Sequence, residues 1–179
     1  MPELNIKACL AVGLVRFAFA GLILCVMASC AKSPGAQAFR APGDAIYSNA
    51  SFDLSRLQGS WQQVAGFADA AGCSGGVATF TKDASGEMRA EARLCVAGRM
   101  QEWSGMVTRV GPGRFAIGAG EPWWVLWDDA DNRTLAIGTP SGSFGFVLDR
   151  QAEIPADRIA AAREILDFNG YDLTRLRRD

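Results

Sequence analysis

Apolar and polar residues alternate in short segments from about residue 60 to residue 149, and Gly, Pro, Asp and Asn separate these segments. Alternation of this kind is typical of half-buried β-strands. Eight strands are expected, over residues 60–67, 75–82, 86–96, 99–109, 113–118, 123–128, 133–139 and 143–149. Because short turns join them in chain order, the pattern predicts an all-β fold, an eight-stranded antiparallel up-and-down barrel with room inside for a small ligand.

The pattern changes its period after the last expected strand. Pro155 opens a segment whose apolar residues recur at helical spacing, and Asn169-Gly170 is a typical stop signal. The apolar stripe of this segment consists of Ile159, Ala162 and Leu166. The stripe is narrow, so we expect one C-terminal α-helix packed on the outside of the barrel. A helix that binds a partner protein is the alternative.

Hairpin geometry decides which side chains point into the barrel, because alternate residues of a strand face opposite sides. Folding the sixth and seventh strands about Ala130-Asp131 pairs Trp124 with Ile137 and leaves Trp123 and Trp127 outside. The expected ligand-binding residues are therefore Met88, Ala90, Ala92, Leu94, Trp103, Trp124, Leu126, Leu135, Ile137, Phe144 and Phe146. None of them is charged, so the lining predicts an apolar ligand. A barrel filled by its own side chains is the alternative.

The N-terminal region contains an apolar run, Phe17 to Ala28, which Lys7 and Arg16 precede. The run has the length of an export-signal core and is too short to cross a bilayer. Met27-Ala-Ser-Cys30 closes it with two small residues and a cysteine, which is the pattern of a lipobox. We therefore expect residues 1–29 to be a lipoprotein signal peptide and Cys30 to carry an acyl anchor. A signal cleaved elsewhere, an uncleaved anchor and a later translation start are the alternatives.

Residues 30–51 differ in composition from the rest of the chain. They are rich in Pro, Gly, Ala and Ser and have no periodic apolar pattern. This composition is typical of a flexible linker. We expect a tether that joins the lipid anchor to one folded domain over residues 52–179.

Composition narrows the function. The formal net charge is -1 and charges of both signs are interspersed, so no nucleic-acid partner is expected. The chain has no histidine, which excludes Ser-His and Cys-His nucleophiles and histidine-ligated zinc. We expect no catalytic residue, no metal and no cofactor. The carboxylate cluster of Asp128, Asp129 and Asp131 leaves an enzyme open as an alternative, although a solvated turn is the preferred explanation of these residues.

Two cysteines, Cys73 and Cys95, fall within the expected domain. The turn signal Asp83-Ala84-Ser85-Gly86 lies between them and is flanked by strand patterns. Folding this hairpin pairs Lys82 with Gly86 and brings the two cysteines opposite each other. An exported protein meets an oxidising compartment, so we expect a disulfide, with two buried free thiols as the alternative.

Both ends of the expected domain carry a family resemblance. Gly59-Ser60-Trp61, which follows Phe52-Asp-Leu-Ser-Arg-Leu57, resembles the Gly-x-Trp signature that opens the first strand of lipocalins. Phe144-Gly-Phe-Val-Leu-Asp-Arg150, followed by Ile154-Pro155 and a helix, resembles the end of bacterial outer-membrane lipocalins. The similarity covers about residues 52 to 176. It implies that Trp61 closes the base of the barrel and that Arg150 lies across its ring, so Gly59, Trp61 and Arg150 are structural residues.

The resemblance also implies a function. It indicates a lipocalin held in the outer membrane by its acyl anchor, facing the periplasm and binding or carrying a fatty acid, a phospholipid or another hydrophobic small molecule. The turn from Asp128 to Arg133 lacks the family's tyrosine, and Phe146 stands where a tryptophan is usual, so the ligand and the oligomeric state are left open. The alternatives are a periplasmic protease inhibitor that acts through an arm at Ala31 to Ser51, and a structural envelope lipoprotein with a filled barrel.

Overall fold

The computed structural model describes residues 38–70 and 72–178 of the 179-residue chain. Its strands are β1 Gly59–Phe67, β2 Gly76–Lys82, β3 Met88–Val96, β4 Arg99–Gly111, β5 Arg114–Ile117, β6 Trp123–Asp128, β7 Thr134–Gly138, β8 Gly145–Asp149 and β9 Leu176–Arg178. The helices are the 3-10 turns η2 Leu54–Leu57 and η3 Leu173–Arg175 and the α-helix α2 Ala156–Phe168. The expected signal peptide, Cys30 and residues 30–37 of the expected tether lie outside the described residues.

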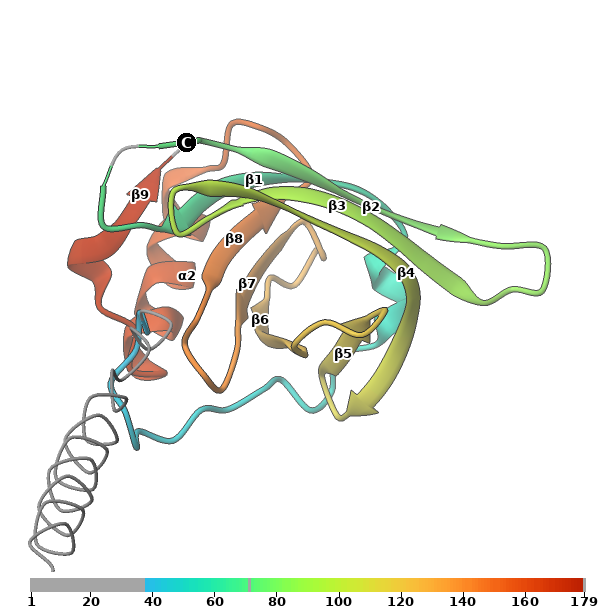
Figure 1. The fold of residues 1–179 in the computed structure, drawn as a ribbon, viewed down its shortest axis with the longest axis horizontal. Helices are drawn as coiled ribbons and strands as arrows, with labels where there is room; N and C mark the ends of the chain where they lie inside the picture. The colour runs from blue at the N-terminus through green and yellow to red at the C-terminus, as the bar shows by residue number, and fades with distance from the viewer. Residues whose placement is uncertain (1–37, 71, 179) are drawn as a thin grey trace, which may run out of the picture. The chain divides into compact units, whose positions relative to one another are not determined.

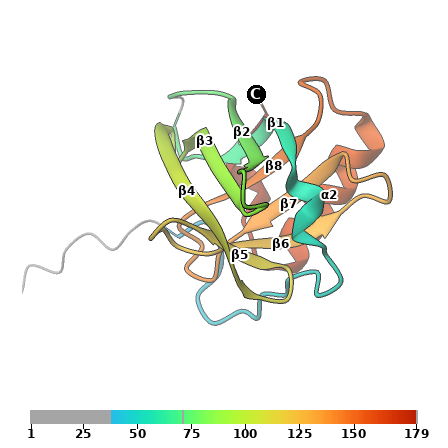
Figure 2. The ribbon, with the colours of Figure 1, turned by 90° about the vertical axis from the view of Figure 1, so that its right-hand side faces the viewer.

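The sheet is a closed antiparallel barrel. Strands β1 to β8 pair in chain order, and β1 also pairs with β8, which closes the ring (Figures 1 and 2). This arrangement confirms the expected fold. The short strand β9 was not expected, and it pairs with β1. Along its length β1 therefore changes partner, since Gly59–Gln62 pairs with β2 and Ala65–Phe67 pairs with β9.

Alternation along the strands gives the sheet two apolar faces. The inner face forms one buried cluster, and the outer faces of β6, β7 and β8 form a second cluster with α2. The buried stripe of α2 is Ile159, Ala162 and Leu166, which confirms the expected helix packed outside the barrel. Within the described ranges, no helix combines the length and the apolar character that a membrane span requires.

Residues 38–51 do not form the flexible tether that their composition suggested. Phe39 is buried and packs on Phe67, with ring centroids 5.8 Å apart. Arg40 is buried as well, and its guanidinium donates to the backbone carbonyls of Asp44, Ala45, Pro140 and Asn169. Further along, the Asn49 N–H donates to the Val125 carbonyl at 2.7 Å. These contacts hold the segment along the barrel (Figure 1), so this part of the chain is not a free arm for binding a protease.

The β2–β3 hairpin has a different register from the expected one. Lys82 pairs with Met88, two residues further than predicted, because the Asp83 carboxylate accepts backbone hydrogen bonds from the turn and stabilises a longer loop. Cys73 lies in the loop before β2, which begins at Gly76. The expected disulfide is nevertheless present, with the Cys73 and Cys95 Cα atoms 5.6 Å apart. It ties the loop before β2 to strand β3.

Candidate functional site: the barrel interior

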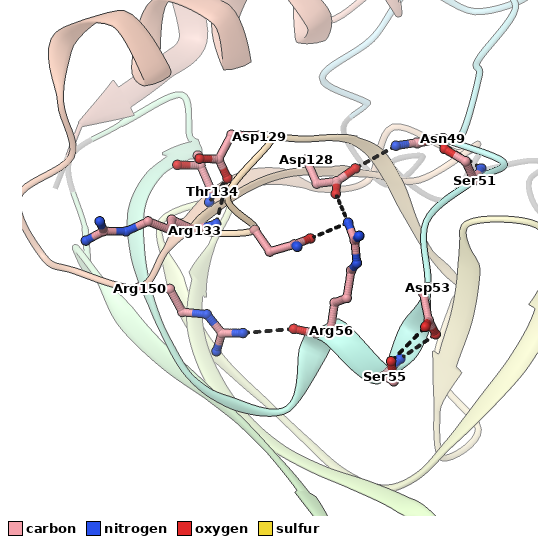
Figure 3. Close-up of polar contacts among 11 residues, drawn as sticks. Asn49, Ser51, Asp53, Ser55, Arg56, Asp128, Asp129, Arg133, Thr134 and Arg150 are labelled. Atoms are coloured by element: carbon pink, nitrogen blue, oxygen red, sulfur yellow. Dashed lines mark hydrogen bonds and ion pairs between the residues drawn. The ribbon is translucent and has the colours of Figure 1, made fainter.

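One end of the barrel is closed by η2, which crosses it in Figure 2. Trp61 is fully buried beside η2, and its indole Nε1 donates to the Leu57 carbonyl at 2.7 Å. The guanidinium carbon of Arg150 lies 3.6 Å from the centroid of the Trp61 ring. Arg150 also donates to the Arg56 carbonyl at 2.8 Å (Figure 3). The contact that the resemblance implied is therefore present, and it seals this end of the barrel.

The aspartates that left an enzyme open also lie at the closed end. The Asp128 carboxylate accepts a hydrogen bond from Asn49 Nδ2 at 2.6 Å and lies 3.5 Å from the Arg56 guanidinium (Figure 3). One carboxylate oxygen of Asp129 accepts two backbone N–H groups of the turn that follows it, at 2.6 and 2.7 Å. Asp131 is exposed. The cluster is thus a capped turn with two ion pairs, from Asp128 to Arg56 and from Asp129 to Arg158.

Most of the residues predicted to line the interior do so. Buried in the inner cluster are Ala90, Ala92, Leu94, Leu135, Ile137, Phe144 and Phe146. Met88 and Trp103 are partly buried and pack against that cluster. The only two buried charged side chains among the described residues, Arg40 and Asp149, do not belong to it. The described part of the interior is therefore apolar, as predicted.

The prediction for β6 was wrong by one residue. Trp123 is fully buried inside the barrel, whereas Trp124 and Leu126 lie on the outer face with α2. The expected hairpin was too short, because Asp128 pairs with Leu135 across a wider turn and a bulge interrupts β6 before Trp127.

The local signal for the wider turn was Asn132, whose φ is 52°. Asparagine tolerates this left-handed conformation better than most residues, so its position marks the end of such a turn. On the outer face, the ring of Trp124 is covered by Arg114, whose guanidinium carbon lies 3.5 Å from the ring centroid.

The end of the barrel opposite η2 is formed by the β1–β2, β3–β4, β5–β6 and β7–β8 loops. Four aromatic side chains gather there, Trp103, Trp123, Phe144 and Phe146, which we call the mouth cluster. Ring centroids are 5.4 Å apart for Trp103 and Trp123, and 4.9 Å apart for Trp123 and Phe146, with the rings of each pair nearly perpendicular. Edge-to-face pairs of this kind are favourable. The four rings thus pack against one another at this end of the barrel, which we call the mouth.

Trp123 differs from Trp61 in its hydrogen bonding. Its Nε1 is the one buried side-chain nitrogen or oxygen among the described residues that has no hydrogen-bond partner. A buried donor without an acceptor is destabilising by about 1 to 3 kcal/mol. The mouth cluster therefore contains one unsatisfied polar atom at the centre of an apolar site.

A family model described as a lipocalin-like domain matches residues 52–179 of the chain. The chain belongs to the lipocalin family. Among curated proteins none matches this lipocalin.

Solved structures with a similar fold include apocrustacyanin A1 of lobster, with 14% identity and a TM-score of 0.56 over 78% of this chain and 89% of that one. The allergen Per a 4 from cockroaches has 11% identity and a TM-score of 0.55 over 79% of this chain and 94% of its own. The siderocalin Ex-FABP, described as functioning through dual ligand specificities, has 14% identity and a TM-score of 0.50 over 68% and 91%. At these identities the likeness concerns the fold.

At the rim of the lipocalin mouth, Glu121 joins the β5–β6 loop to the β7–β8 loop. Its carboxylate accepts hydrogen bonds from the hydroxyls of Thr139 and Ser143 and from the Ser141 N–H. Burial raises the pKa of Glu121, but these hydrogen bonds outweigh it and hold the pKa below its ordinary value. The rim therefore carries an ionised carboxylate at neutral pH.

Tyr171 supports the same β7–β8 loop from outside the barrel. Its hydroxyl accepts from the Thr139 N–H and donates to the Phe144 carbonyl, both at 2.8 Å. Gly138 and Gly145 allow this approach, because a Cβ at either position would lie 2.7 Å from an atom of Tyr171. Burial raises the pKa of Tyr171 to about 12. Sequence reasoning missed Tyr171 and Glu121, whose partners are remote in the chain and leave no local signal.

Gln63 connects β1 to β3 at the point where β1 no longer pairs with β2. It is buried, its Nε2 donates to the Cys95 carbonyl at 2.8 Å, and its Oε1 accepts the Cys95 N–H at 2.7 Å. Beside this connection, a hollow of about 360 Å³ is lined by Phe67, the disulfide and the arginines of β9. Both ends of the Gln63 amide are therefore satisfied within the barrel wall.

Proposed function

We propose that this lipocalin binds an acyl lipid, a fatty acid or a phospholipid, inside its barrel. One observation carries the proposal: aromatic side chains on the inner faces of β6 and β8 lie across the barrel from small residues on β2 and β3, and none of the described residues places a buried charge between them. The small residues are Ala78, Ala90 and Ala92. A flexible apolar chain can bury its surface against such side chains without loss of hydrogen bonds.

The free energy of binding comes from apolar surface. Burial contributes about 25 cal/mol per Å² of ligand surface before association costs are subtracted. Because the rings of the mouth cluster pack against one another at the mouth, a ligand enters as Trp103 and Phe144 turn aside. Trp103 is only partly buried, and Phe144 lies in the loop before β8, so these are the two rings that we expect to move.

Titration of the purified protein with N-phenyl-1-naphthylamine, a neutral apolar fluorophore, tests the proposal. We expect saturable fluorescence that fatty acid or phospholipid displaces. Ala92→Phe places a ring in the interior and should abolish binding, whereas Glu91→Phe, on the outer face of the same strand, should leave it unchanged. If the Ala92→Phe variant binds the probe as tightly as the wild type does, the probe binds outside the barrel interior and the proposal is refuted.

A structural lipoprotein with a filled barrel is the second candidate. The ring contacts of the mouth cluster favour it, since Phe144 and Phe146 stack with centroids 5.7 Å apart. In that case the wild type binds no probe, and Ala92→Phe only overpacks the core, which costs about 1 to 3 kcal/mol of stability.

We further propose that the protein is anchored in the bacterial outer membrane through acylated Cys30 and faces the periplasm. The apolar run and lipobox that end at Cys30 support this location, and the Cys73–Cys95 disulfide suits an oxidising compartment. Cys30→Ser should abolish labelled-palmitate incorporation and release the protein from the membrane fraction. Palmitate incorporation and membrane attachment that survive Cys30→Ser would refute the anchor.

A further inference from the structure

The unsatisfied donor of the mouth cluster indicates what kind of ligand the barrel takes. Trp123 Nε1 is fully buried and has no acceptor among the described residues, whereas the equally buried Trp61 Nε1 donates to Leu57. The neighbours of Trp123 are rings: Trp103, Phe115, Phe144 and Phe146 lie with centroids between 4.9 and 6.3 Å away. The site offers a hydrogen bond that the protein does not use.

The acceptors near the mouth are already occupied. Both amide ends of Gln63 bond to the Cys95 backbone, and both carboxylate oxygens of Glu121 accept hydrogen bonds from the β7–β8 loop. None of these groups bonds to Trp123 Nε1, so this donor is left for an oxygen of a bound molecule.

The charge of that oxygen is also constrained. Apart from Arg40, no cation among the described residues is buried, and Glu121, two residues before Trp123, places an anion at the rim. Arg40, the buried cation of the β7–β8 loop region, is committed to four backbone carbonyls. A carboxylate at Trp123 would be buried without a counter-charge, which is unfavourable.

We propose that Trp123 Nε1 donates to a neutral carbonyl oxygen of the ligand, so that the lipocalin selects acyl esters over free fatty acids. This inference rests on the proposed function and narrows its ligand class. The acyl chain lies along the alanines of β2 and β3, and the ester group sits at the mouth cluster. The ester is favoured over an alkane by one hydrogen bond from Trp123 Nε1, and over a free fatty acid by the unfavourable free energy of burying a carboxylate without a counter-charge.

The test compares three probes of equal carbon number: methyl decanoate, its isomer undecanoic acid, and undecane. Binding to the purified protein is followed at neutral pH by tryptophan fluorescence, and the five indole N–H signals are resolved by NMR. We expect affinity to fall in the order ester, alkane, acid. The ester should move the Trp123 indole proton downfield more than undecane does, and loss of this signal in Trp123→Phe assigns it.

Variants separate the hydrogen bond from the shape of the site. Trp123→Phe should weaken ester binding roughly five- to tenfold and leave undecane binding nearly unchanged. The matched control Trp124→Phe, on the outer face, should change neither. Equal losses for ester and undecane, or acid binding tighter than ester, would overturn the inference and leave the proposed function standing. Binding of no probe by the wild type would refute both.

Discussion

Tyr171 gives the most direct test of how the mouth is held. Its hydroxyl bonds to two backbone groups of the β7–β8 loop, the Thr139 N–H and the Phe144 carbonyl. Tyr171→Phe keeps the ring and leaves both groups without their partner. We expect it to lower the free energy of unfolding by about 1 to 3 kcal/mol at neutral pH, measured by urea denaturation followed by tryptophan fluorescence.

The pH dependence sharpens this prediction. The pKa of Tyr171 rises from 10.0 to about 12 on folding, so the folded state favours the neutral phenol. Stability from this group is fully present below pH 10 and is lost as the pH rises toward 12. The loss is on the order of 3 kcal/mol across that window. The stability difference between wild type and Tyr171→Phe should therefore shrink by this amount, since the variant has no phenol to ionise.

The assay has an internal control. The chain has two tyrosines, and the other, Tyr47, is 58% exposed. In a Tyr47→Phe background the ultraviolet absorbance of tyrosinate reports Tyr171 alone, and it should appear only above pH 10. Tyrosinate that forms at pH 10, or a stability difference that stays constant with pH, would refute the reasoning.

Three further predictions concern other parts of the structure. Replacing Cys73 and Cys95 with serine should lower the free energy of unfolding by about 3 kcal/mol, because the bridge spans a sequence separation of 22; an unchanged urea midpoint would contradict this. Arg150→Lys should lower the free energy of unfolding by about 0.5 to 2 kcal/mol, since lysine cannot stack flat on Trp61. An equal decrease in a Trp61→Phe background would show that stacking on the indole is not the cause. The stabilising effect of Glu121 should be lost as the pH drops through its lowered pKa. The difference in thermal midpoint between wild type and Glu121→Gln should therefore be smaller in acid than at neutral pH. A difference that grows in acid would refute this.

The strands and the outer helix could be predicted because their information is local. A period of two residues along each strand and a helical stripe after Pro155 follow directly from which side of each element is buried. The pairing of Arg150 with Trp61 came from a motif rather than a period. In each of these features the types of the residues involved are sufficient to indicate the local structure.

The prediction of inward-facing residues was wrong in β6, because the facing of this strand depends on the length of one turn. A shift of a single residue exchanges the two faces of a strand, so the wider turn at Asn132 moved Trp123 inward and Trp124 outward. Both residues are tryptophans, and their order carries no polarity signal to reveal the error.

The docked segment at residues 38–51 could not be found from its composition. Two of the four carbonyls that bind Arg40, those of Pro140 and Asn169, lie a hundred or more residues away in the chain. The surroundings of Arg40 in the sequence have the composition of a linker, and only the folded barrel supplies these two partners. Gln63 and Tyr171 were missed for the same reason.

The change of partner along β1 has a consequence for the order of events during synthesis. The half of β1 at Ala65–Phe67 acquires its second neighbour only when Leu176–Arg178 is available, and Phe39 and Arg40 bond to residues after position 139. A chain made from its N-terminus therefore exposes these edges until more than a hundred further residues have emerged. Contacts so distant in sequence close slowly, and an unpaired strand edge invites association with other chains. The barrel of this lipocalin is sealed by the last part of the described chain to leave the ribosome.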